Sequence, residues 1–247
     1  MVMFTRLFQA AERAARMPSL CAVCHDWGMS RVCHECVRRF APALPRCRHC
    51  ALEVPAGTET CGACLIDPPP FAEALAAVDY GHPWDTLITR FKFHEALDLA
   101  AVLAGRMLDA HRSAQAHAPT LLLPIPLSDA RLRERGYNQA WILTRRLGAA
   151  LRCEVEPDLL LRIKDTPHQL ALPPDRRAGN VRGAFAVEPG RRAELQGRTV
   201  TLVDDVMTTG ATVAEAARSL LQAGAREVGV WVVARTPRHD STWPDPA

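Results

Sequence analysis

Residues 199–212 read TVTLVDDVMTTGAT, and this stretch decides the fold. Its first five residues are apolar or β-branched and carry no charge, which is typical of a strand buried on both faces. The acids Asp204 and Asp205 follow at the expected strand end, then a short loop, a helix with apolar side chains at helical spacing and an uncharged strand at 228–234. This order predicts a βαβ unit whose loop lies at the carboxyl edge of a parallel sheet, where such sheets bind ligands.

The residue types in the loop suit a phosphate group. Backbone N–H groups at a helix start and the hydroxyls of Thr208, Thr209 and Thr212 can surround a phosphate dianion. Gly210 allows close approach of the backbone and a positive φ. Paired carboxylates would repel a phosphate unless they bind ribose hydroxyls or Mg²⁺. The loop therefore favours a sugar phosphate with vicinal hydroxyls, and the alternative is a strand end with solvated acids and a threonine N-cap.

The segment resembles the motif with which type I phosphoribosyltransferases bind phosphoribosyl pyrophosphate (PRPP): apolar residues, two acids, two spacers and Thr-Thr-Gly-x-Thr. The resemblance implies that Asp204 and Asp205 bind the 2′- and 3′-hydroxyls of the ribose. It also implies that the following loop wraps the 5′-phosphate. That loop comprises Val206, Met207, Thr208, Thr209, Gly210, Ala211 and Thr212.

Eight of the nine cysteines form four Cys-x-x-Cys pairs: Cys21/Cys24, Cys33/Cys36, Cys47/Cys50 and Cys61/Cys64. Each pair can place two thiolates on one tight turn, so four pairs supply two tetrahedral Cys₄ zinc sites. Pairing in chain order gives two zinc ribbons, and an interleaved cross-brace is the alternative. A secreted disulfide cluster is disfavoured because residues 1–20 lack a secretory apolar core. Cys₄ sites have no open coordination position, so we assign them to folding and docking rather than to catalysis.

The chain of 247 residues has room for one α/β domain and a small appendage. Its net charge of +3 is too small to indicate a nucleic-acid partner. No apolar run is long enough for a membrane span, and we expect a cytoplasmic protein. The expected segments are an amphipathic helix at 1–20, a double zinc ribbon at 21–67, the α/β domain at 68–236 after a proline-rich linker, and a polar tail at 237–247.

The α/β domain offers further elements and two groups of cations. Strands are expected at 74–80, 120–124 and 183–187, and helices at 84–93, 97–108 and after residue 139. Lys92 lies between two phenylalanines, and the favoured interpretation is that its stem covers the core rather than that it contacts a substrate. Cys153 is expected to be a small buried residue.

Arg131 and Arg135 are four residues apart and share one face if Ser128 caps a short helix. Guanidinium pairs suit a pyrophosphate, although an arginine-rich solvated turn fits the spacing equally well. Residues 162–183 show almost no periodicity and contain three prolines, which favours a lid over the ligand. Arg176 in this segment is the third pyrophosphate candidate, and no residue is identifiable as a general base.

These features in this order resemble the ComF family, which is associated with bacterial competence. The matching pieces are the four cysteine pairs, FKFH at 91–94, PIPLSDARLRERGYNQA at 124–140 and the PRPP motif. The resemblance implies a type I phosphoribosyltransferase-like α/β fold with a mostly parallel central sheet, preceded by a small double zinc ribbon. It implies Mg²⁺-assisted transfer from PRPP to a nitrogen acceptor.

The alternative function is a non-catalytic module that senses PRPP, or that binds single-stranded DNA or a protein of the competence machinery during transformation. Many transferases of this fold are dimers, so a homodimer is compatible with the resemblance, but the sequence indicates no interface.

Overall fold

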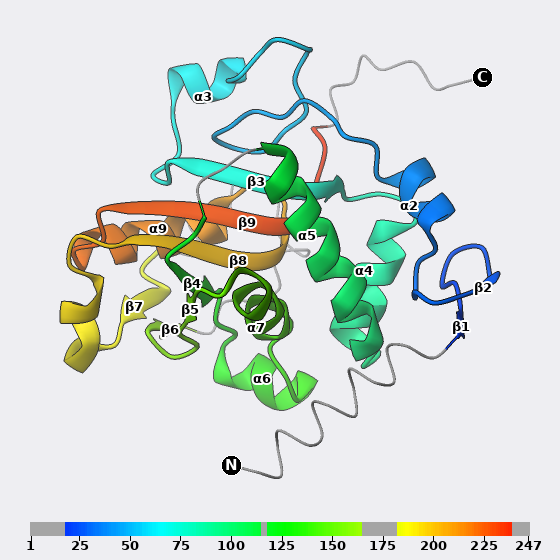
Figure 1. The fold of residues 1–247 in the computed structure, drawn as a ribbon. Helices are drawn as coiled ribbons and strands as arrows, with labels where there is room; N and C mark the ends of the chain where they lie inside the picture. The colour runs from blue at the N-terminus through cyan, green and yellow to red at the C-terminus, as the bar shows by residue number, and fades with distance from the viewer. Residues whose placement is uncertain (1–17, 115–117, 165–181, 239–247) are drawn as a thin grey trace.

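A computed structural model of the chain describes residues 18–114, 118–164 and 182–238 (Figure 1). Most of the expected N-terminal helix, most of the polar tail, and Arg176 with the central part of the expected lid lie outside the described residues. Among the helices of the described ranges, none combines the length and apolar character needed to cross a bilayer.

The core of the fold is a parallel sheet of five strands in the order β3-β9-β8-β4-β5. This confirms the predicted α/β class. The strands are β3 (Glu73–Asp79), β4 (Leu121–Pro124), β5 (Glu154–Val155), β8 (Thr199–Met207) and β9 (Glu227–Arg235). Strand β8 was expected to end before the two acids, but it continues to Met207 because its ladder with β9 pairs Asp204 with Val232 and Met207 with Arg235.

Helices cover both faces of the sheet (Figure 1). Side chains of α4 (Trp84–Phe93), α5 (Ala100–Ala114) and α7 (Gln139–Leu151) form one apolar cluster with Val203 and Trp231. Those of α9 (Ala211–Gln222) form the other cluster with Val200 and Leu202. Successive residues of a strand point to opposite faces, so an uncharged strand such as β8 fits a sheet covered on both sides. Helix α5 is preceded by the 3₁₀ turn η1 (Leu97–Leu99), so the predicted helix begins in this tighter form.

The strand expected at 183–187 exists but does not join the central sheet. It is β7 (Phe185–Val187), and it pairs antiparallel with β6 (Leu160–Arg162) as a separate ribbon. Ser219 of α9 donates a hydrogen bond to the Phe185 carbonyl at 3.1 Å, which holds the ribbon against α9. The 3₁₀ helix η3 (Pro189–Leu195) then leads to β8.

The cysteine-rich segment contains β1 (Ser19–Leu20), β2 (Trp27–Gly28), α2 (His34–Phe40) and α3 (Gly62–Ile66). Its first half docks near α4, where Trp84 donates to the Phe40 carbonyl at 2.6 Å and Arg31 pairs with Asp98 at 2.5 Å. The second half lies beside β3, the outer strand at the opposite end of the sheet from β5 (Figure 1). There Arg46 pairs with Asp79 at 2.8 Å.

Candidate functional site

The eight paired cysteines form two separate clusters. In each cluster the four Sγ atoms lie within 4.8 Å of one another; the clusters are Cys21, Cys24, Cys33 and Cys36, and Cys47, Cys50, Cys61 and Cys64. Four sulfurs bound to one tetrahedral zinc at about 2.3 Å would lie about 3.8 Å apart. The Sγ atoms of Cys24 and Cys33 are 3.6 Å apart, and those of Cys21 and Cys36 are 3.9 Å apart. The cysteines therefore pair in chain order, the interleaved arrangement is absent, and the geometry fits zinc.

The backbone of each cluster favours thiolates. The N–H of Cys33 points to the Sγ of Cys21 at 3.3 Å, and the N–H of Cys61 points to that of Cys47 at 3.3 Å. Burial opposes ionisation of Cys21 and Cys47, but donation from neighbouring backbone N–H groups outweighs it and lowers the pKa of both thiols. The same arrangement occurs in both clusters, and each could hold a metal ion.

A second group of charged side chains meets at the carboxyl edge of β8. Asp205 is buried, and its Oδ2 lies 2.9 Å from the Nζ of Lys92 at the end of α4. The sequence predicted only that the Lys92 stem covers the core, and the structure adds that its ammonium group pairs with Asp205. Helix α4 follows β3 and ends at the edge where β8 presents its acids, a juxtaposition that periodicity within either segment could not reveal. The available signal was a rare lysine between aromatic residues.

Backbone N–H groups of β8 hold the carboxylates of Asp204 and Asp205 in place. The Asp205 N–H donates to the Oδ1 of Asp204 at 2.9 Å, and the Val206 N–H donates to the Oδ1 of Asp205 at 2.7 Å. Burial and the charge of Asp205 raise the pKa of Asp204, and Lys92 counteracts them in part. Two carboxylates held this close are well suited to accept hydrogen bonds from two neighbouring hydroxyls.

Asp204→Asn is expected to stabilise the fold, and to do so more at higher pH. Because the folded state raises this pKa, it binds more protons than the unfolded chain once the pH exceeds the ordinary aspartate value of about 4. Stability of the native protein therefore falls as the pH rises from there, whereas the asparagine variant lacks this loss. We expect the variant to melt about 5 °C higher at about pH 8 and to match the native protein at about pH 4. Calorimetric melting at both pH values tests this. A difference in melting temperature between the variant and the native protein that narrows with rising pH would contradict the prediction.

The loop after β8 turns into α9 at Gly210, which has a φ of 84° and occupies the N-cap. A residue with a Cβ is strained at this φ, so the glycine is required by the backbone. No threonine is the N-cap, although the Oγ1 of Thr209 accepts from the Ala211 N–H at 3.3 Å. The carbonyls of Met207 and Thr208 both accept hydrogen bonds from Arg235 at the end of β9.

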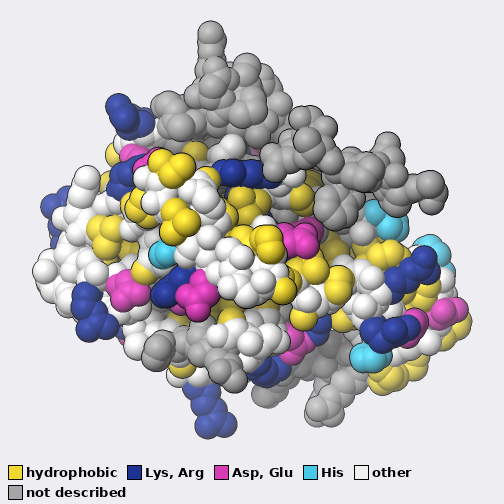
Figure 2. All heavy atoms as spheres, turned by 90° about the horizontal axis from the view of Figure 1, so that it is seen from above, with side chains coloured by type: hydrophobic (Ala, Val, Ile, Leu, Met, Phe, Trp, Pro, Cys, Tyr) yellow, Lys and Arg dark blue, Asp and Glu magenta, His cyan; other side chains and the backbone are white. Residues whose placement is uncertain are grey.

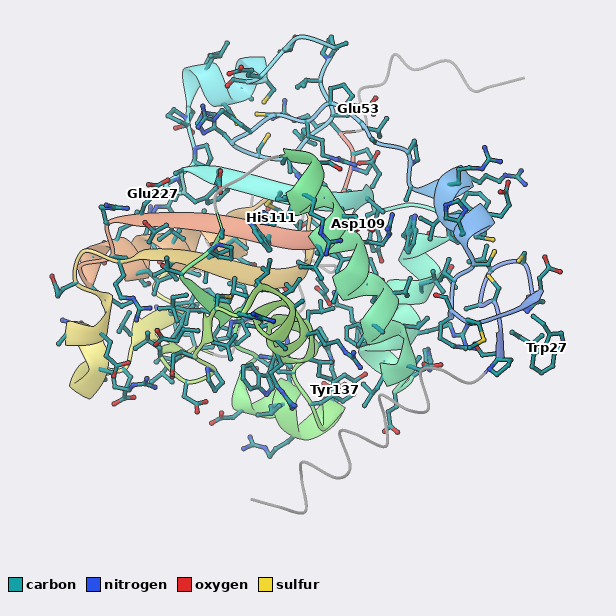
Figure 3. The ribbon with its side chains drawn as sticks, in the orientation of Figure 1. Trp27, Glu53, Asp109, His111, Tyr137 and Glu227 are labelled. Carbon is teal, nitrogen blue, oxygen red and sulfur yellow. The ribbon has the colours of Figure 1, made fainter. Side chains whose placement is uncertain are left out.

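Helix α6 (Asp129–Arg135) follows β4 and therefore lies at the same edge of the sheet. As predicted, the side chain of Ser128 caps it, accepting from the Arg131 N–H at 3.5 Å. Arg135 lies 4.7 Å from the Phe93 ring centroid and donates to Gln139, so α4 and α7 engage its guanidinium. Tyr137, between α6 and α7, donates to the Phe91 carbonyl (Figure 3).

The structure thus brings Asp204, Asp205, the loop and the unexpected Lys92 to one edge, with α6 beside them. Arg135 already has protein partners, and Arg176 lies outside the described residues.

Comparison with known proteins agrees with this architecture. Residues 172–245 match the family described as phosphoribosyl transferase domain. A DNA utilization protein YhgH from Salmonella typhi is 34% identical over 232 residues, covering 89% of this chain and 98% of that protein. Competence protein F from Haemophilus influenzae is 34% identical over 208 residues, covering 83% and 90%.

A purine phosphoribosyltransferase structure from Pyrococcus horikoshii is 14% identical with a TM-score of 0.33, covering 56% of this chain and 82% of that one, a likeness too weak to add to the assignment. The two sequence relatives are similar over most of their length and establish the family. The chain belongs to the ComF family, with two cysteine clusters followed in the chain by a phosphoribosyltransferase-type domain.

Proposed function

We propose that the carboxyl edge of β8 binds PRPP with Mg²⁺ and that the protein transfers the phosphoribosyl group to a nitrogen acceptor. One observation carries this proposal: Asp204 and Asp205 are neighbours near the carboxyl end of the parallel strand β8, which continues to Met207 and leads through a short loop into α9 at a glycine with positive φ. Two acids that can accept hydrogen bonds from vicinal hydroxyls, next to a loop that can bind phosphate, match a ribose 5-phosphate. The acids complement the ribose hydroxyls, and the loop complements the 5′-phosphate.

Each part of the site has a distinct role in the proposal. The loop and the first turn of α9 bind the 5′-phosphate through backbone N–H groups and the hydroxyls of Thr208, Thr209 and Thr212. Asp204 and Asp205 accept from the ribose hydroxyls, and Lys92 pairs with the buried Asp205 and fixes the position of its carboxylate. Val206 and Met207 at the end of β8, and Gly210 and Ala211 at the start of α9, supply backbone groups on either side of the loop.

During transfer, the acceptor nitrogen would form a bond to C1 of the ribose while the bond to pyrophosphate breaks. Mg²⁺ bound with PRPP would neutralise charge on the leaving pyrophosphate, and carboxylate oxygens such as those of Asp204 are ligands that it prefers. Arg131 and Arg135, on helix α6 after the neighbouring strand β4, are the described candidates to bind pyrophosphate from the protein side.

We further propose that each cysteine cluster holds one structural zinc ion. The spacing of the sulfurs and their backbone N–H donors support this. Reduced metal-binding cysteines are typical of reducing compartments, which supports a cytoplasmic location. The expected homodimer stays a prediction.

The direct test is calorimetric titration of PRPP with Mg²⁺ into the zinc-loaded protein and into Asp205→Asn. We expect binding in the native protein and a loss of at least about a hundredfold in the variant, because a buried charge-assisted acceptor for a ribose hydroxyl is removed. Arg112→Met, whose side chain is 71% exposed near the end of α5, is the surface control. Pyrophosphate release with mixed amine and nucleobase acceptors then distinguishes transfer from binding alone. Absence of heat in the folded native protein would contradict the proposal.

The second candidate is a module that binds single-stranded DNA or a competence protein, and the relatives' names, DNA utilization protein and competence protein, favour it. On the face drawn in Figure 2, basic and acidic side chains of the described residues are interspersed, which gives this candidate little electrostatic support there. DNA binding that weakens steeply with salt, in a protein that gives no heat with PRPP, would make it the leading function.

A further inference from the structure

Arg235, the last residue of β9, lies between the second cysteine cluster and the phosphate loop. Its side chain is buried, and its Nε donates to the carbonyl of Cys50 at 2.8 Å. Its Nη1 donates to the carbonyl of Met207 at 3.0 Å and to that of Thr208. A guanidinium is planar and rigid, so one side chain fixes the relative position of two segments that are far apart in sequence.

These contacts have a directional consequence for the loop. In a trans peptide the carbonyl of one residue and the N–H of the next point in opposite directions. Because Arg235 holds the carbonyls of Met207 and Thr208 on its own side, the N–H groups of Thr208 and Thr209 point away from it. Those N–H groups belong to the loop assigned to the 5′-phosphate, so Arg235 is a positioning residue for phosphate donors.

The other anchor of Arg235 depends on the second cluster. The carbonyl that it binds belongs to Cys50, whose Sγ lies 3.6 Å from that of Cys61. The next residue, Ala51, is fully buried in the apolar cluster under α9, and its carbonyl accepts from Arg46 at 3.0 Å. A metal ion bound by this cluster would hold Cys50 in place through its Sγ, and the turn that carries the Cys50 carbonyl would lose that restraint without the ion.

We propose that metal occupancy of the second cluster and PRPP binding at the loop are coupled through Arg235, whereas the first cluster is not part of this coupling. The inference rests on the proposed PRPP function. Loss of metal from the second cluster would weaken PRPP binding, and by linkage PRPP must raise the metal affinity of that cluster by the same factor. We expect this higher affinity to appear as slower loss of metal to a chelator. The first cluster docks instead through Arg31 on Asp98 and the Phe40 carbonyl on Trp84, so it serves as an internal control.

The experiment follows cysteine alkylation in the full-length zinc-loaded protein. A chelator selective for zinc over Mg²⁺ removes the metal, N-ethylmaleimide traps each freed thiol, and peptide mass spectrometry gives a rate for every cysteine with and without PRPP and Mg²⁺. We expect PRPP to slow alkylation of the second cluster about fivefold or more and to leave the first cluster unchanged. For the second cluster, the alkylation rates are those of Cys47, Cys50, Cys61 and Cys64.

Suppose that calorimetry shows PRPP binding, but PRPP slows alkylation of both clusters equally or of neither. That result would overturn the coupling and leave the proposed function intact. Absence of calorimetric binding would overturn both. Arg235→Lys keeps the charge, but a single ammonium group cannot bond both the Cys50 carbonyl and the loop carbonyls. In this variant PRPP should therefore no longer protect the second cluster selectively from alkylation. Arg31→Lys, at the first cluster, should retain the selective protection. If Arg235→Lys does not fold, the comparison of the two clusters in the native protein still decides the question.

Discussion

Replacing Cys64 with serine is expected to lower the melting temperature of the whole chain by about 10 °C, because a structural zinc site contributes its binding free energy directly to folding. Cys64 is buried, and its Sγ belongs to the second cluster. A hydroxyl is a poor zinc ligand, so the variant should also bind one zinc ion fewer. The loss should extend to the α/β domain, since the second cluster contacts it through Arg46 on Asp79 and Arg235 on Cys50.

Cys153→Ser is the matched control, because Cys153 lies outside both clusters. Burial raises the pKa of its thiol, as expected for a packed and unreactive cysteine. We expect its melting temperature to change by no more than about 3 °C. Scanning calorimetry and zinc quantification measure both variants. Equal shifts in the two variants would mean that the cluster contributes no metal-dependent stability.

The second large effect is expected at Lys92. Lys92→Met should destabilise the protein by about 3 kcal/mol at neutral pH, because it leaves the buried carboxylate of Asp205 without its cationic partner. The same change should weaken PRPP binding, since Lys92 no longer orients the Asp205 carboxylate that is proposed to accept a hydrogen bond from a ribose hydroxyl. Urea unfolding measures the first effect, and PRPP calorimetry the second.

A double-mutant cycle with Asp205→Asn isolates the pair. The double variant should be more stable than Lys92→Met alone, because no unpaired buried charge remains. PRPP binding should stay weak in the double variant, which separates folding from ligand recognition. Arg112→Met is the control for removal of a cation, since the Arg112 side chain is exposed and pairs at 3.0 Å with Asp109 on the surface of α5. If the changes in unfolding free energy caused by Lys92→Met and Asp205→Asn simply add in the double variant, Lys92 and Asp205 do not interact energetically and the prediction is wrong.

Local sequence patterns predicted much of this fold. The helix at 84–93 was predicted with its observed ends, and the strands containing residues 199–203 and 228–234 were predicted in place. Such elements are readable because their periodicity and caps lie within one segment. The end of β8 was predicted too early, because its last residues are held by a ladder with β9 rather than by their own apolar character. The strand at 183–187 was predicted, but its pairing with β6 was not.

The sequence by itself determined the βαβ unit, the two acids before the phosphate-type loop, the four cysteine pairs and the family. Each of these depends on residues close together in the chain. Only the tertiary structure decided that the cysteines pair in chain order, that Lys92 meets Asp205 and that Arg235 joins Cys50 to the loop. These contacts link residues that the parallel sheet and its docked cysteine unit bring to one edge, and a parallel sheet juxtaposes segments separated by whole crossover connections.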